Sequence, residues 1–212
     1  MNEIISPEKI IADIEGALVP VTKTKVQPFS ISAMFTLIFM QFFSFRMPTS
    51  MSKVLSQSNW TYHTAFSIGR AAETLGLDCT YETMGRLDAV IQIPGEEPRT
   101  ILFAEWEARY KSVFGEGQEL EKLWSGSTQN KGANALLITY CPFDEYGAFV
   151  REVTEFWQTR DKLRKHRPVL FLVTILYEKE NRMDVFQTIS GIEIHKDGVK
   201  IWGDFDENET VF

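Results

Sequence analysis

The sequence contains little histidine, little cysteine and no excess of positive charge. Its three histidines, His63, His166 and His195, are too scattered for the spacing of a zinc site. Its two cysteines, Cys79 and Cys141, lie in apolar, strand-like stretches, so we expect reduced thiols in a cytoplasmic protein. The formal net charge of −7 gives no basic footprint of the kind that nucleic-acid-binding proteins typically carry. It does not exclude nucleic-acid binding, because acidic clusters and the C-terminal stretch DFDENETVF supply much of the imbalance.

Several sequence motifs are also absent. The chain has no P-loop, no glycine-rich dinucleotide fingerprint and no internal repeat, so the nucleotide-binding and repeat classes that depend on them are not indicated. With 212 residues, 44% of them hydrophobic and 24% charged, the composition is that of an ordinary globular protein with a substantial core. We predict an N-terminal helical and apolar extension over residues 1–58 and a main domain over residues 59–212.

One long apolar run lies inside the predicted extension. Residues 26–45 carry no charge and are flanked by Lys25 and Arg46. The length suits a transmembrane helix, but hydroxyl side chains and Gln41 interrupt the run, and it begins too far into the chain for a signal peptide. Two interpretations stay open: a membrane-spanning helix, or a buried helix or oligomer-interface element through which two copies pair.

The remaining chain alternates between helical and strand-like patterns. Helices are predicted over residues 6–18, 59–75, 116–125 and 144–165, and strands over residues 77–84, 134–141 and 168–177, with two strands around the turn at 94–98 and a final hairpin over 184–202 that turns at 196–198. A strand–helix–strand step with apolar strands implies a parallel pair. We therefore expect an α/β fold in which helices cover both faces of a mixed sheet.

Three carboxylates occupy apolar segments on either side of the turn at 94–98. Asp88 precedes the turn, and Glu105 and Glu107 follow it, at positions where the neighbouring residues are mostly hydrophobic. Desolvating a charge costs several kcal/mol unless a partner compensates for it. The turn formers at 94–98 predict that the two segments are adjacent antiparallel strands.

A turn symmetric about residues 96 and 97 fixes the pairing of these strands. In this register Val90 faces Phe103, and Asp88 faces Glu105. Directly opposed residues have Cβ atoms about 4.5–5.5 Å apart, and like charges at that separation are destabilising. No lysine or arginine lies on that face of either strand, so the pattern predicts a metal cation between the two acids.

The element order and the acids together resemble the PD-(D/E)xK nuclease superfamily, whose members have the restriction-endonuclease-like fold. That family has an acid on its second strand and an acid-x-lysine triplet on its third. Asp88 matches the first acid and Glu105 the second, whereas Glu107 stands where the family usually has lysine. A Glu-x-Glu variant occurs among restriction enzymes. The resemblance covers roughly residues 60–176.

The resemblance implies hydrolysis of phosphodiester bonds in DNA with Mg²⁺ or Mn²⁺. Divalent ions held by carboxylates neutralise charge at the scissile phosphate and lower the pKa of bound water. By this analogy Asp88 and Glu105 are metal ligands, and Glu107 is a general base or a further ligand. Glu73, on the helix before the sheet, is an auxiliary acid or the surface partner of a nearby basic residue. Lys122 and Lys131 are candidates for a relocated lysine.

Three basic residues are candidates for contact with the phosphates of DNA: Lys111, Arg160 and Arg164. The last two belong to the stretch RDKLRKHR at 160–167. Basic residues in the last turn of a helix also complement the helix dipole, which gives this stretch a second interpretation. The alternative to a nuclease is a catalytically inactive protein of the same fold that acts as a nucleic-acid-binding or assembly module.

Overall fold

The computed structural model describes residues 34–38, 40, 57–83, 87–160, 167–180 and 183–206. The chain divides into two compact units, residues 1–31 and 32–212, and every described residue belongs to the second unit. Several predicted features lie outside the described residues: the helix at 6–18, most of the apolar run at 26–45, Arg164 and the end of the C-terminal stretch. The predicted division at residue 58 and the pairing of two copies through the apolar run stay predictions.

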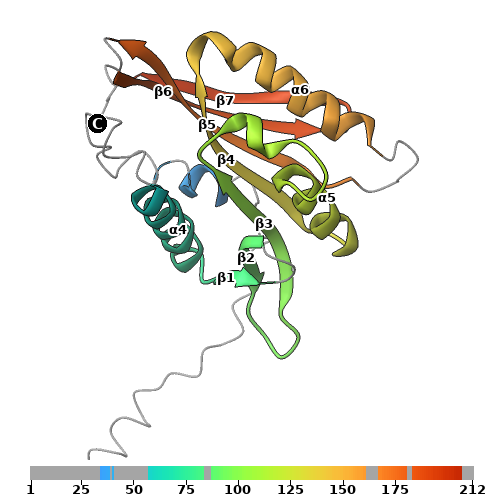
Figure 1. The fold of residues 1–212 in the computed structure, drawn as a ribbon. Helices are drawn as coiled ribbons and strands as arrows, with labels where there is room; N and C mark the ends of the chain where they lie inside the picture. The colour runs from blue at the N-terminus through green and yellow to red at the C-terminus, as the bar shows by residue number, and fades with distance from the viewer. Residues whose placement is uncertain are drawn as a thin grey trace, which may run out of the picture. The chain divides into compact units, whose positions relative to one another are not determined.

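The predicted mixed sheet is confirmed and has seven strands. In spatial and chain order they are β1 (Asp78–Thr83), β2 (Leu87–Ile93), β3 (Arg99–Glu107), β4 (Asn134–Pro142), β5 (Leu170–Glu180), β6 (Met183–His195) and β7 (Gly198–Asp206). The first three strands are antiparallel, β3, β4 and β5 are parallel, and β5, β6 and β7 are antiparallel (Figure 1). The parallel steps are those for which the chain places a helix between two apolar strands.

Besides a short helix at residues 34–38, three longer α-helices and two short 3₁₀ helices accompany the sheet in the described part of the chain. They are α4 (Gln57–Thr74), η1 (Tyr110–Val113), α5 (Glu119–Gln129), η2 (Phe143–Glu145) and α6 (Tyr146–Thr159). Helices α5 and α6 bury their apolar stripes against one face of the sheet, where the rings of Trp124 and Trp157 meet edge to face at 5.1 Å. Both tryptophans therefore belong to the core.

The other face of the sheet is covered by α4 and by a short helix at residues 34–38. The ring of Trp60 in α4 lies 4.3 Å from that of Tyr140 in β4, and Phe35 stacks on Phe171 in β5 at 4.9 Å. Side chains alternate along a strand, so Phe171 points away from Leu170 and Leu172, which pack under α5 and α6. Helices thus flank the sheet on both of its faces.

The described part of the apolar run is the helix at residues 34–38. Its Met34, Phe35 and Ile38 are almost completely buried. Among the described residues, no helix is both long enough and apolar enough to cross a membrane. The burial of these three side chains agrees with the buried-helix interpretation, whereas Met40, a further described residue of the run, is 53% exposed.

Several predicted helix boundaries are wrong by two residues or more, and two of them have a clear physical cause. Helix α5 begins at Glu119 instead of residue 116, because Gly117 adopts a φ of +72°, a left-handed conformation that an α-helix cannot include. Helix α6 ends at Thr159 instead of residue 165, since Arg160 has extended backbone angles. The prediction extends the helix because polar residues typical of an exposed helical surface follow Thr159 in the sequence.

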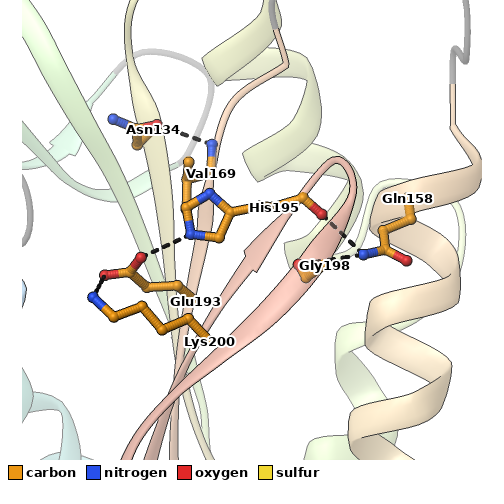
Figure 2. A network of polar contacts seen from close by, with 7 residues as sticks. All are labelled: Asn134, Gln158, Val169, Glu193, His195, Gly198 and Lys200. Carbon is orange, nitrogen blue, oxygen red and sulfur yellow. Dashed lines mark hydrogen bonds and ion pairs between the residues drawn. The ribbon is translucent and has the colours of Figure 1, made fainter.

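The turn between β6 and β7 is held from both sides (Figure 2). Gln158 of α6 donates hydrogen bonds from Nε2 to the main-chain oxygens of His195 at 2.9 Å and Gly198 at 3.4 Å. The His195 ring lies 2.8 Å from the buried carboxylate of Glu193, and the Lys200 ammonium lies 3.9 Å from the same carboxylate. The turn that the sequence predicts at residues 196–198 is therefore tied both to a helix and to a buried acid.

Candidate functional site

The register of β2 and β3 decides where the acids meet. Val90 pairs with Phe103 and Ala89 with Ala104, as the sequence predicted. After Ile91 the register shifts by one residue toward the turn. A bulge of this kind adds one residue to one strand and increases the local twist. The prediction is therefore right beside the acids and wrong beside the turn.

Asp88 and Glu105 are neighbours at the ends of these strands. Continuing the register by one residue from Ala89 places them opposite each other, and their carboxyl groups are in hydrogen-bond contact. Glu105 is buried, with 1% of its surface exposed, and Asp88 is half-buried. The backbone N–H of Trp106 donates to Oδ2 of Asp88 at 2.8 Å, which fixes one oxygen of that carboxylate.

Lys122 supplies the positive charge that this pair needs. It projects from α5, and its Nζ lies 3.0 Å from Oε1 of Glu105 and 3.5 Å from Oε1 of Glu119. The expectation that neither strand offers a cation on this face was right, but the helix after β3 offers one. Of the two candidates for a relocated lysine, Lys122 is thus beside the acids, whereas Lys131 is exposed in the turn after α5.

Burial sets the protonation behaviour of the site. It raises the pKa of Glu105 to about 9, with a further contribution from the charge of Asp88, and Lys122 opposes the rise only in part. Burial also raises the pKa of Asp88, against the hydrogen bonds from Trp106 and Glu105. Burial lowers the pKa of Lys122, but the contact with Glu105 and the charges of the nearby acids raise it more, so the pKa is raised overall. The acid pair therefore binds a proton more readily than isolated carboxyls do.

Two buried carboxylate oxygens at the site have no hydrogen-bond partner among the described residues. One is Oε1 of Glu105, which forms an ion pair with the Lys122 ammonium at 3.0 Å. The other is Oε2 of Glu119. Unsatisfied buried oxygens are costly, and a hard cation is one group that satisfies them. The sequence analysis did not single out Glu119, although an acid three residues before a lysine in the first helical turn is a recognisable pairing.

The structure does not gather Glu107 or Glu73 with this pair. Within the described ranges, no set of three or more histidine, cysteine, aspartate or glutamate side chains converges closely enough to hold a metal ion. Oε1 of Glu107 accepts the backbone N–H of Arg109 at 2.9 Å. Glu73 is exposed and forms an ion pair with Arg70 at 2.6 Å. This is the second of the two roles predicted for it, that of a surface partner of a basic residue. The predicted cluster of acids therefore reduces to Asp88 and Glu105.

The basic residues proposed for phosphate contact are paired within the protein where they are described. Lys111 lies 3.0 Å from Glu145, and Arg160 lies 2.5 Å from Glu121. The guanidinium of Arg160 also lies over the ring of Phe156. A phosphate would have to compete with these carboxylates for either side chain.

Comparison of the chain with protein-family models, with curated proteins and with solved structures gives no match.

Because the pKa of Glu105 is raised in the folded protein, the stability of the fold should depend on pH. Between its usual pKa of 4.5 and its folded pKa of about 9, the folded protein holds a proton that the unfolded chain has released. The metal-free protein should therefore lose stability as the pH rises through this window, whereas below it the contribution is complete. Each unit of pKa difference corresponds to about 1.4 kcal/mol, so we expect a loss of more than ~1 kcal/mol between about pH 5 and pH 8.

Urea unfolding at a series of pH values measures this loss. Glu105→Gln removes the titrating group and should flatten the dependence, while Glu97→Gln, at an exposed position in the hairpin turn, should leave it unchanged. A wild-type slope that matches the slope of Glu105→Gln would contradict the assignment.

Proposed function

We propose that the protein is a metal-dependent nuclease that hydrolyses phosphodiester bonds with Mg²⁺ or Mn²⁺ held by Asp88 and Glu105. The proposal takes the α/β sheet to be of the restriction-endonuclease-like type and the protein to be cytoplasmic. The observation that carries it is a buried acid, Glu105, in contact with Asp88 and 3.0 Å from Lys122. Two acids and a lysine on this hairpin and the following helix are the residue types that the resemblance requires.

The donor set fits a divalent cation. Mg²⁺ is commonly bound by one or two carboxylates while it keeps several waters, so two acids suffice without a third. Oε1 of Glu105 is buried and lies 3.0 Å from the Lys122 ammonium, so an ion bound there would have to share or replace that ion pair. When bound, the ion would neutralise charge on the phosphate and lower the pKa of a bound water.

Each residue then has a definite task. The Trp106 N–H holds one oxygen of Asp88, and this carboxylate would serve as a metal ligand. Lys122 takes the place of the lysine missing at position 107, and its ammonium orients an attacking water or the phosphate oxygen. Glu107 lies two residues beyond Glu105 on the same strand, and the resemblance would make it a general base or a further ligand, although the structure does not gather it with Asp88 and Glu105.

The competing hypothesis is that the Asp88–Glu105–Lys122 contacts are a satisfied structural pair in a non-catalytic binding or assembly module. A lysine beside two acids neutralises them without any metal, which is why the distinction needs an experiment.

Calorimetric titration with Mn²⁺ and Mg²⁺ tests the metal site. We expect binding by the wild type and a loss of affinity of at least tenfold in Asp88→Asn, because that change removes a carboxylate ligand at constant shape. Glu97→Gln should bind like the wild type. Bound metal should also stabilise the protein, by about 2.7 kcal/mol at a hundredfold excess over the dissociation constant. Equal binding by Asp88→Asn and the wild type, or no binding at millimolar metal, would contradict the site.

A further inference from the structure

A cavity of about 590 Å³ adjoins Asp88, one of the two proposed catalytic acids. Its walls include Tyr62 and Ala65 of α4, Tyr81 and Glu82 of β1, and Asp88 and Trp106 of the two acidic strands. Cavities of this size accept a ligand as large as a nucleotide. Since Asp88 is part of the wall, a ligand in this aromatic pocket lies next to the site proposed for hydrolysis.

The pocket presents aromatic rings to solvent. Tyr62 is 73% exposed and Tyr81 is 41% exposed, and the ring of Tyr62 stacks on that of Phe66, which is also exposed. Exposed aromatic side chains that gather in one place indicate a binding surface more often than isolated ones do. Exposed aromatic rings on which bases can stack are a feature by which proteins hold unpaired nucleic-acid bases.

The position of Tyr81 is fixed by its contacts with α4. Its hydroxyl donates a hydrogen bond to the main-chain oxygen of Ala65 at 2.7 Å. Directly beside it, Gly69 has no Cβ, and a Cβ at that position would lie 2.5 Å from the Tyr81 hydroxyl oxygen. A glycine at this point of the helix is therefore what allows the ring to lie against α4. One aromatic wall of the pocket is thus built into the fold.

The charge of the pocket selects among possible ligands. Glu82 and Asp88 contribute acidic groups, and no lysine or arginine is among the described residues that line it. A phosphate group alone is therefore a poor occupant. A nucleobase is neutral, offers an aromatic face to the tyrosines and donates N–H groups that a carboxylate such as Glu82 accepts.

We propose that the aromatic pocket binds an unpaired nucleobase, so that single-stranded nucleic acid is the substrate class presented to Asp88 and Glu105. This inference rests on the proposed nuclease function. A base within a duplex has both faces covered by its neighbours and would have to leave the stack to enter the pocket. The base, next to the acids, would position the adjoining phosphodiester for attack.

Fluorescence anisotropy with short labelled oligonucleotides tests the pocket separately from cleavage. Ca²⁺ replaces Mg²⁺ so that the proposed metal site is occupied while binding is measured. Low salt is used because contacts with phosphate groups contribute less to the affinity as the salt concentration rises. The ligands are single-stranded DNA, single-stranded RNA, an abasic single strand and duplex DNA. The proteins are the wild type, Tyr62→Ala, Tyr62→Phe and Phe143→Ala, the last being an exposed aromatic of η2 outside the pocket.

We expect tight binding of a single strand with bases and weaker binding of the duplex and of the abasic strand. Tyr62→Ala should weaken single-strand binding by about tenfold or more, Tyr62→Phe should retain it, and Phe143→Ala should leave it unchanged. Comparison of the DNA and RNA arms identifies which sugar the site prefers. Equal binding of duplex and single strand, equal binding by Tyr62→Ala and the wild type, or binding of none of the ligands would overturn the proposal.

The two proposals fail in different ways. Tyr62-dependent binding without any metal-dependent cleavage would leave the pocket in place and refute the nuclease. Cleavage that needs Glu105 but does not respond to Tyr62→Ala would refute the pocket alone.

Discussion

Glu105→Gln is expected to lower metal-dependent cleavage of DNA by about a thousandfold, which corresponds to about 4 kcal/mol of lost transition-state stabilisation. The change keeps the shape of a buried side chain but removes its charge, and Glu105 is the most buried of the proposed ligands. The metal should bind more weakly, and the metal that does bind should be poorly placed. Nicking of a plasmid and cleavage of labelled single strands, both followed over time, measure the effect.

The matched control for this change is Glu97→Gln in the hairpin turn between the same two strands. It makes an identical chemical change at an exposed position and should leave cleavage unaltered. If Glu105→Gln cleaves at the wild-type rate, or if both variants lose activity equally, Glu105 does not have the proposed role.

Lys122→Met should lower cleavage by about a hundredfold, or ~2.7 kcal/mol, without weakening metal binding. Methionine retains most of the length of the side chain and removes the ammonium that lies 3.0 Å from Glu105. A cation beside two carboxylates competes with a metal ion electrostatically, so its removal should leave metal affinity equal or higher. The lost function is the orientation of the attacking water or the phosphate.

Measuring activity at saturating metal separates this role from simple neutralisation. If Lys122 only neutralises the acids, a saturating metal should replace it and restore cleavage in Lys122→Met. If it orients a reacting group, activity should stay low at every metal concentration. Recovery of wild-type activity at saturating Mg²⁺ or Mn²⁺ would contradict the catalytic assignment of Lys122.

The fold was predictable because its signals are local. Apolar runs such as 134–141 and 168–177 correspond to β4 and β5, and turn formers locate the hairpins. The pairing of Val90 with Phe103 followed from the position of one turn. The bulge after Ile91 was not predictable, because it depends on how the twisted strands pack rather than on residue type.

The site was predictable in part. Strand alternation brings Asp88 and Glu105 together, and that arrangement can be read from the register. The contact of Lys122 with Glu105 depends on how α5 docks on the sheet, which involves residues far apart in sequence. Because the Lys122 ammonium is positively charged, it compensates for the charge of the two acids, and a metal ion is not required for that purpose. Glu107 shares the strand but accepts a backbone N–H from Arg109, a local turn that the alternating pattern did not include.

The most direct test of the central claim is cleavage by the purified wild-type protein. Single-stranded DNA, duplex DNA and RNA are incubated at low salt with Mg²⁺, with Mn²⁺ and with a chelator, beside Glu105→Gln. The account predicts cleavage of at least one substrate by the wild type with metal, none with chelator, and almost none by Glu105→Gln. No cleavage of any substrate by the wild type, or cleavage that survives the chelator or the Glu105→Gln change, would contradict it and favour the non-catalytic binding module.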